Sequence, residues 1–476
     1  MRVINAFRLP GLCVLLLLAS ISSQAAWQRI DASTVIDTLD DSIIVDGRLG
    51  FEDGDIQRFP GCASAPAVVI DPETGVPVID PETGFPEFRI DEDGHIETTP
   101  REFSFFVDLG DDPSNPPSDL LIYLGGGGAC WDDATCIGSA LTPLPTYFPA
   151  FSETTVQLEA ASEDFDGSGA GGILTRVRGS NPYAHFAKVY IPYCTGDVHV
   201  GSNDAVYSYP PLFPAWAIGH RGFDNLMLVL KWLQKQEING FDFDGDITVS
   251  GSSAGGYGAL INFPVIRDAL GERADYSIIV DSANGVLTDG FLNSAFGPPG
   301  EEGVWGAKQN LGSLLQPILD QADADSLWVN VFHAVGREYP DTRISQSTSA
   351  FDAVQALVLL FMQRVDQGTY SPFVPPTEEE VFLTSFFDWS PKARSAMLTT
   401  SFDVWNYRKY LGAGSGHIHL IDPPANVVSF PTTNFFEEDS ARNVRYTDWL
   451  DDMLNNPRLF FRTDWRNRSC FPNCLR

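Results

Sequence analysis

The stretch that decides the fold is Val249-Ser250-Gly251-Ser252-Ser253-Ala254-Gly255-Gly256-Tyr257-Gly258. Its residues 251–255 fit the pattern Gly-x-Ser-x-Gly, and they lie between an apolar run typical of a strand and a stretch of helix-forming residues. A sharp turn from strand to helix strains the central serine and presents its hydroxyl to solvent, while the glycines let neighbouring backbones approach. We therefore expect Ser253 to act as a nucleophile, with the Ala254 N–H directed at a developing oxyanion.

The segments on either side of this turn alternate between strand and helix patterns. Short apolar runs predict strands, whereas an amphipathic spacing or a run of good helix formers predicts helices. The expected strands are residues 120–124, 189–193, 247–250, 276–280, 327–332 and 343–348, and the expected helices are residues 223–236, 254–270 and 447–455. This order predicts the α/β class with an α/β-hydrolase-like fold, in which a mostly parallel sheet has helices on both faces.

Composition divides the chain into three parts. Residues 1–26 form a leader, residues 27–117 an acidic N-terminal extension rich in Pro and Gly, and residues 118–476 the expected α/β-hydrolase-like catalytic domain. Inside the extension, the segment Ile70-Asp71-Pro72-Glu73-Thr74-Gly75 recurs at residues 79–84. With two copies, this repeat predicts a duplicated surface turn or a β-ribbon rather than a solenoid.

The leader has the features of a secretory signal peptide. Arg2 and Arg8 precede an apolar run at residues 12–19, and small residues follow up to Ala25 and Ala26, after one of which we expect cleavage. The run is too short to cross a membrane. The sequence therefore predicts a secreted or periplasmic protein.

Cleavage of the leader removes one of the seven cysteines and leaves six. An even number in an exported chain favours disulfides, and the simplest local pairings are Cys130 with Cys136 and Cys470 with Cys474. A metal site is the weaker interpretation, because no repeated Cys-x-x-Cys pair or histidine cluster accompanies the cysteines. The acidic loops at residues 91–94 and 163–167 carry carboxylates suited to Ca²⁺, but neither has the spacing of a calcium loop, so we interpret them as solvated loops.

The charge of the chain excludes several classes of partner. The sequence has 63 acidic and 30 basic side chains, which gives a formal net charge of -33. Affinity for phosphate needs clustered Lys and Arg, so we expect neither a nucleic-acid partner nor attraction to an anionic membrane. No later stretch stays apolar over about 18 residues, so no membrane span is expected either.

A second motif, Leu124-Gly125-Gly126-Gly127-Gly128-Ala129-Cys130-Trp131, ends the expected strand at residues 120–124. A glycine run at this end of a buried strand exposes consecutive N–H groups, which the other half of an oxyanion hole requires. A phosphate cradle would need a following Lys and Ser or Thr, and none follows. The alternative is a flexible turn closed by a Cys130–Cys136 bridge, but the position of the run before the serine turn favours the oxyanion hole.

A serine nucleophile also needs a histidine base within hydrogen-bond reach. Of the seven histidines, only His333, His417 and His419 follow Ser253 in the chain. His417 comes directly after the glycines of the loop at residues 412–416, and it is our candidate base, with His419 as the reserve.

An orienting carboxylate is expected between the serine and the histidine in the chain order. Asp352 follows the expected strand at residues 343–348 and is one candidate, although it could instead cap the helix that comes next. Asp281 ends an earlier expected strand and competes for the same role.

Taken together, these motifs make the chain similar to the pectin acetylesterase family, which includes the Notum-type carboxylesterases. The glycine motif resembles the family segment L-E-G-G-G-W-C-W, and residues 251–256 match its G-S-S-A-G-G. Tyr193-Cys194-Thr195-Gly196-Asp197 is similar to its Y-C-D-G segment, and Arg221-Gly222 to an R-G before a helix. Phe351-Asp352 with Gln355 resembles the segment that bears the family's catalytic Asp.

The resemblance covers roughly residues 118–425. It implies an α/β-hydrolase-like fold and a catalytic triad of Ser253, Asp352 and His417. It further implies that the N–H groups of Gly127, Gly128 and Ala254 form the oxyanion hole.

From these observations we predict a secreted serine esterase that removes short acyl groups, most simply acetyl, from a carbohydrate or another alcohol through an acyl-enzyme. It would need no metal and no organic cofactor. Two alternatives stay open: a lipid or polyester carboxylesterase, and a secreted binding module that keeps the fold without turnover.

Overall fold

A computed structural model describes residues 27–81, 84–110, 114, 116–141, 172–176, 181–210, 212–238, 241–321, 323–421, 440–455 and 465–475. The leader at residues 1–26 and the acidic loop at residues 163–167 lie outside the described residues. Among the helices of the described part, none is both long enough and apolar enough to cross a lipid bilayer.

The centre of the molecule is a sheet with nine strands in the described part of the chain. Across the sheet, the strands are β1 (Gln28–Asp31), β7 (Ser104–Asp108), β9 (Ala187–Ile191), β8 (Leu120–Leu124), β12 (Asp246–Ser252), β13 (Asp275–Asp281), β14 (Arg343–Ser349), β15 (Tyr407–Gly412) and β18 (Arg468–Ser469). Strand β7 runs antiparallel to β1 and β9, and the other neighbouring strands pair in parallel. The predicted α/β class and mostly parallel sheet are confirmed. Because β1 and β7 precede residue 118, the expected extension supplies two strands of this sheet.

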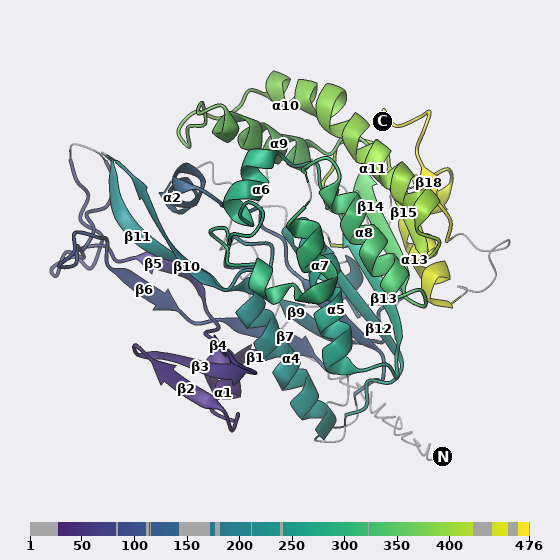
Figure 1. Ribbon diagram of the computed structural model, residues 1–476, viewed down its shortest axis with the longest axis horizontal. Helices are drawn as coiled ribbons and strands as arrows, with labels where there is room; N and C mark the ends of the chain where they lie inside the picture. Colours follow the sequence, from purple (N-terminus) through teal and green to yellow (C-terminus); the bar gives the residue numbers. More distant parts are fainter. Residues whose placement is uncertain are drawn as a thin grey trace, which may run out of the picture.

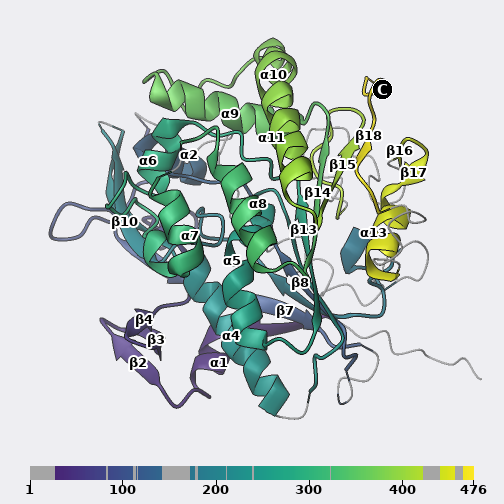
Figure 2. The same ribbon diagram turned by 45° about the vertical axis from the view of Figure 1, so that its right-hand side comes forward.

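Both faces of the sheet are buried, as the continuous apolar runs require. On β8, Leu120, Ile122 and Leu124 belong to one hydrophobic core and Leu121 and Tyr123 to a second core on the other face. Helices α4 (Gly222–Ile238), α5 (Ala254–Leu270), α7 (Gly312–Leu319) and α8 (Leu327–Glu338) cover the first face, and α13 (Tyr446–Asn455) covers the second (Figures 1 and 2).

One expected strand is wrong: residues 327–332 begin helix α8. The run is apolar and rich in aromatic and β-branched residues, which favours a strand when it is taken alone. The buried side chains, however, are Leu327, Trp328, Val331, Phe332 and Val335. This spacing of three and four residues is helical and aims one stripe at the core.

Further helices lie above the ends of the parallel strands (Figure 1). They are α6 (Asp289–Ala295), α9 (Ala353–Asp366), α10 (Glu378–Thr384) and a π-helical turn η3 (Ser385–Trp389); α11 (Ser390–Asp403) runs down from there beside α8 and β15 (Figure 2). The smaller helical elements are α1 (Ala32–Ile36), α2 (Asp133–Leu141), η1 (Gly172–Leu174) and η2 (Lys308–Asn310).

Small antiparallel sheets flank the main one. They are formed by β2 (Ser42–Val45), β3 (Arg48–Asp53) and β4 (Ile56–Arg58), by β5 (Cys62–Pro66) with β6 (Thr98–Arg101), by β10 (Asn203–Tyr209) with β11 (Phe213–His220), and by β16 (Ser440–Ala441) with β17 (Val444–Arg445). In the repeat, Ile70 pairs with Pro77 and Ile79 with Pro86 in antiparallel bridges, as a β-ribbon does. In the acidic loop at residues 91–94, Asp91 Oδ1 accepts hydrogen bonds from the N–H groups of Asp93 and His95, which closes a turn.

Three disulfides join the six cysteines that follow the leader. Cys130 bonds to Cys136 and Cys470 to Cys474, so both predicted local pairs are confirmed. The third bond links Cys62 to Cys194 across 132 residues. It ties the N-terminal region to the loop that follows β9.

Candidate active site

Ser253 forms the turn between β12 and α5. Its backbone has φ 55° and ψ -124°, a strained conformation for a residue with a side chain. The Ser253 N–H donates to the Asp281 carbonyl over 2.8 Å, which ties the turn to the neighbouring strand. A Cβ atom on Gly255 would lie 1.9 Å from the Leu124 carbonyl oxygen, so only glycine permits this contact between α5 and the end of β8.

His417 lies on the loop after β15 and contacts a buried carboxylate. Its Nδ1 is 2.9 Å from Asp352 Oδ2 and 3.0 Å from Asp352 Oδ1. The Nε2 atom is buried and makes no hydrogen bond to the described part of the chain. A neutral imidazole that donates from Nδ1 to a carboxylate presents an acceptor at Nε2, which is the arrangement that a general base needs.

Asp352 is fully buried and holds its position through the start of α9. Its Oδ1 accepts from the Val354 and Gln355 N–H groups over 3.1 Å and 3.0 Å. Its Oδ2 accepts from Gln355 Nε2 over 2.9 Å. The side chain therefore caps the helix, as the sequence allowed, and also faces His417.

One cavity connects these groups. It encloses about 730 Å³, its open side included, and its lining includes Gly128, Ser253, Ala254 and His417. Gly127 precedes Gly128 in the same run and Ala254 begins α5, where a first-turn N–H has no partner within the helix. The sequence-predicted residues thus follow β8, β12, β14 and β15 and meet beyond the carboxyl ends of these parallel strands. Open α/β sheets bind ligands at these strand ends.

The rest of the lining is mostly apolar, and its polar side chains are Tyr257, Ser282 and Gln355. The apolar side chains come from α5, α6, α8, α9, η3 and nearby loops: Ala129, Val198, Ile261, Val286, Leu287, Phe291, Phe296, Leu327, Trp328, Val354, Val358, Met362 and Trp389. Phe296 and Trp389 lie in the Phe-rich segments at residues 293–325 and 365–400, which the sequence allowed as a pocket wall, whereas the residues of α5, α8 and α9 were not expected at the site. The spacing of Val354, Val358 and Met362, four residues apart after Asp352, was the available signal of a helix face directed at the site.

Asp281 and His419, the alternative acid and base, form a second carboxylate–histidine pair next to the site. His419 Nδ1 lies 3.1 Å from Asp281 Oδ1, and both side chains are fully buried. Asp281 Oδ2 also accepts from the N–H groups of His419 and Leu420 and from Ser252 Oγ, over 2.8 to 3.0 Å. Burial raises the pKa of Asp281, but the hydrogen bonds and the charge of His419 and the backbone N–H groups outweigh it, so the pKa lies below its ordinary value.

This second pair connects the segments under the site. Ser347 Oγ on β14 donates to Asp281 Oδ1 over 2.8 Å, and Tyr123 OH on β8 donates to Ser252 Oγ over 2.9 Å. The Asp281 carboxylate therefore fixes the path of the loop that carries His417.

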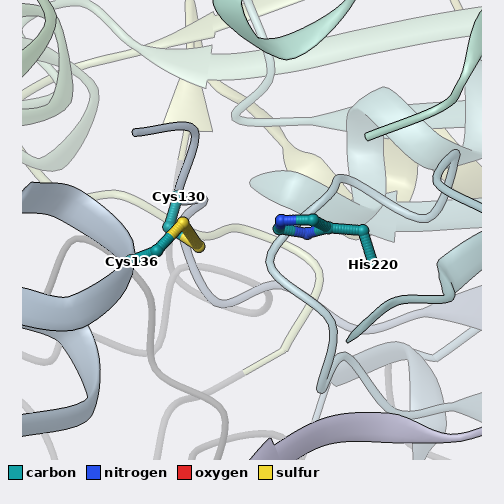
Figure 3. Close-up of side chains that lie close together, drawn as sticks. All are labelled: Cys130, Cys136 and His220. Atoms are coloured by element: carbon teal, nitrogen blue, oxygen red, sulfur yellow. A yellow bond between two sulfur atoms is a disulfide. The ribbon is translucent and has the colours of Figure 1, made fainter. Parts of the chain in front are cut away.

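Cys130, Cys136 and His220 lie close together (Figure 3). The two sulfur atoms bond to each other and are not thiolates. The ring of His220 has protein partners at both nitrogens, Thr195 O at Nδ1 and Tyr207 OH at Nε2. This chemistry does not fit a metal site, which needs deprotonated thiols and a free imidazole nitrogen.

A family model, a curated relative and a solved structure are similar to this chain. Residues 112–290 match the model of the pectinacetylesterase family, which confirms the resemblance inferred from the sequence. The palmitoleoyl-protein carboxylesterase NOTUM of Schmidtea mediterranea is 29% identical over 179 residues, which span 36% of this chain and only 29% of that protein. A structure of the Wnt deacylase Notum from Drosophila aligns over 83% of this chain and 93% of that chain, with 17% identity and a TM-score of 0.40.

Proposed function

We propose that this relative of the pectin acetylesterases is an exported serine carboxylesterase with Ser253, His417 and Asp352 as its catalytic triad. The observation that carries the proposal is that His417, held through Nδ1 by a buried Asp352, shares one cavity with a serine in a strained strand-to-helix turn. The family match over residues 112–290 supports the serine turn and the glycine run. It ends before Asp352 and His417, so their assignment rests on the geometry.

In the proposed reaction, Ser253 Oγ attacks the ester carbonyl carbon and its proton passes to His417 Nε2. Asp352 keeps the proton of the neutral ring on Nδ1 and stabilises the imidazolium. The N–H groups of Gly127, Gly128 and Ala254 receive the oxyanion. His417 then protonates the leaving alcohol, and water activated by the same ring releases the acid from Ser253.

The cavity favours an acyl group longer than acetyl. An acetyl methyl reaches only the side chains beside Ser253, whereas the apolar wall extends over α6, α8, α9 and η3. Apolar lining of this kind stabilises a bound chain by about 0.8 kcal/mol per buried methylene. The name of the NOTUM relative, a palmitoleoyl-protein carboxylesterase, supports the same choice, while the name of the family supports acetyl as the second candidate.

Hydrolysis of p-nitrophenyl esters from acetate to palmitate tests both parts of the proposal. We expect kcat/KM to rise with chain length until the cavity is full, and Ser253→Ala to abolish turnover at every length. If kcat/KM were highest for acetate, the protein would be a deacetylase. Turnover that survives in Ser253→Ala would refute the triad, and a wild type inactive at all lengths would favour the binding module.

A filled cavity provides a sharper test of the acyl site. Val358→Trp places a large ring in the cavity, so we expect it to lower kcat/KM for long esters at least tenfold and to leave acetate hydrolysis within threefold. Leu360→Trp is the matched control, because Leu360 lies on the same helix and is not among the residues that line the cavity. If both variants lowered kcat/KM for long esters equally, the cavity would not be the binding site of the acyl chain.

Export is the last part of the proposal. The three disulfides support an oxidising compartment. The mature N-terminus, measured by mass spectrometry of the exported protein, should be Ala26 or Trp27. A mature chain that still begins at Met1 would contradict the signal peptide.

A further inference from the structure

The glycine run at residues 125–128 is too flexible by itself to keep its N–H groups in fixed directions. Four consecutive glycines, Gly125 to Gly128, have more backbone freedom than any other tetrapeptide. An oxyanion hole, however, works only when its N–H groups are already aimed at the reacting oxygen. Something outside the run must therefore hold it.

The loop after β9, residues 195–199, contacts the first glycine of the run and Cys130, two residues beyond the last glycine. The Cys130 N–H donates to the Gly196 carbonyl over 3.0 Å. His199 Nε2 lies 2.8 Å from the Gly125 carbonyl oxygen. A carbonyl oxygen only accepts, so Nε2 carries the proton and donates it.

This loop is itself rigid. The carboxylate of Asp197 is fully buried and accepts hydrogen bonds from Thr195 Oγ1 and from the N–H groups of His199, Gly201 and Gly222. Val198 and His199 have φ values of 48° and 64°, a conformation that non-glycine residues adopt only when their surroundings impose it.

The ring of His199 is wedged between the glycine run and the helix that begins after Ser253. A Cβ atom on Gly258 of α5 would lie 3.0 Å from His199 Cβ and 3.1 Å from Cδ2 of its ring, so the ring packs on the helix. The backbone is held there too, because Asn262 Nδ2 donates to the His199 carbonyl over 2.9 Å. The side chain is buried, and this burial lowers the pKa of His199, which keeps the ring neutral. The ring thus links the two halves of the proposed oxyanion hole through one hydrogen bond and one packing contact.

We propose that His199 is a positioning residue: its Nε2–H holds the Gly125 peptide so that the N–H groups of Gly127 and Gly128 stay aimed at the oxyanion. This role rests on the proposed esterase function, and it assigns work to a buried histidine that the triad does not use. The effect belongs to the transition state, because the oxyanion exists only there, so its loss should lower kcat and leave KM nearly unchanged.

Three substitutions separate the hydrogen bond from the packing. The Nε2 of glutamine overlays that of histidine, whereas asparagine is too short to reach the Gly125 carbonyl and leucine has no donor. We expect His199→Asn and His199→Leu to lower kcat about 10- to 100-fold with KM within threefold, and His199→Gln to keep kcat within threefold of the wild type. Asparagine tolerates the positive φ of this position, so the Asn variant is the one that best preserves folding.

A second readout follows the oxyanion directly. When Ser253 adds to the carbonyl carbon of an alkyl trifluoromethyl ketone, its proton passes to His417 and the ketone oxygen becomes the oxyanion. Affinity for this ketone should fall by the same factor as kcat across the His199 variants, and affinity for the corresponding alcohol should not change. His333→Leu, in the half-buried histidine on α8, is the control for loss of a histidine elsewhere.

The results decide separately on the two proposals. A His199→Gln variant as impaired as His199→Asn, unchanged kcat in the Asn and Leu variants, or a rise in KM without a fall in kcat would each overturn the role of His199. A wild type that hydrolyses no ester, or a Ser253→Ala variant as active as the wild type, would instead overturn the esterase function.

Discussion

Burial distinguishes two histidines that lie only two positions apart. The side chain of His417 is 13% exposed and lines the cavity, whereas that of His419 is fully buried in its pair with Asp281. A base must exchange protons with substrate and water, so the partial exposure of His417 supports it over His419 as the proposed base. The second pair instead connects the serine turn, β14 and the histidine loop.

Replacing the carboxylate of Asp352 or of Asp281 by an amide should therefore have different consequences: the first mainly for activity, the second mainly for stability. We expect Asp352→Asn to lower kcat by about 10³- to 10⁴-fold, because the amide presents the wrong hydrogen-bonding partner to His417 Nδ1. Its loss of stability should be smaller than that of Asp281→Asn, because the asparagine oxygen still accepts from the Val354 and Gln355 N–H groups that cap α9. We expect Asp281→Asn to lower the free energy of unfolding by about 3 kcal/mol, because its amide NH₂ meets donors that need an acceptor. Esterase kinetics and urea unfolding of both variants measure the two effects, and the reverse assignment of phenotypes would exchange the roles of Asp352 and Asp281.

At the level of elements, the sequence predicts most of the parallel sheet. Buried parallel strands are continuous apolar runs, so β8, β9, β12 and β13 are visible as patterns without any tertiary information. Helix α8 is not, because a short apolar run suits a buried helix as well as a strand and only its packing decides.

In the candidate site, too, one part could be predicted from the sequence and another could not. The serine turn is a local motif, and Ser253 has the strained backbone that such a motif indicates. Which acid pairs with which histidine depends on the path of the loop after β15 relative to β13 and α9, and no local pattern encodes that path. The sequence left Asp352 and Asp281, and His417 and His419, as alternatives for this reason.

The contact between α5 and β8 gives a prediction at the scale of elements. Gly255→Ala would place a Cβ 1.9 Å from the Leu124 carbonyl and push the serine helix away from the glycine run. We expect it to destabilise the fold by more than 2 kcal/mol and to lower kcat, because overpacking forces backbone shifts. Gly47→Ala, in a turn with φ 76° and open space around it, is the control and should cost about 1 kcal/mol with unchanged kinetics. Equal losses of activity in both variants would contradict the special role of Gly255.

At the scale of the whole molecule, the three disulfides should differ in their effect on stability. Loop entropy assigns about 5 kcal/mol to Cys62–Cys194, which closes a loop of 132 residues, and about 2 kcal/mol to Cys470–Cys474, which closes a loop of 4. The double alanine variants, compared by guanidinium unfolding without reductant, measure the difference. A Cys470–Cys474 variant as destabilised as the Cys62–Cys194 variant would show that loop closure in the unfolded chain is not the main effect.

His220 gives the molecule a defined response to acid. Burial lowers the pKa of His220 to about 4 in the folded chain, from 6.5 for the exposed group. Between these values the unfolded chain binds more protons, so this contribution to stability is complete above pH 6.5 and is lost as the pH falls toward 4. The loss amounts to about 3 kcal/mol for this one group.

The variant His220→Asn keeps a donor toward the Thr195 carbonyl and does not titrate. Its unfolding free energy in urea, compared with that of the wild type at pH 7 and pH 5, isolates the histidine from the carboxylates. We expect the difference between the two proteins to shrink as the pH falls. A constant difference would mean that His220 is not the titrating group.

The strand order has a mechanical consequence as well. The first and last strands of the described chain, β1 and β18, form opposite edges of the central sheet. A pulling force applied between the two ends of the chain therefore loads the edges before the middle. Strand β18 pairs with β15 at two positions and β1 with β7 at four, so we expect both edge strands to detach before the strands between them. The strands that lead to Ser253 and Asp352, β12 and β14, lie in the interior of the sheet, where we expect tension to arrive last.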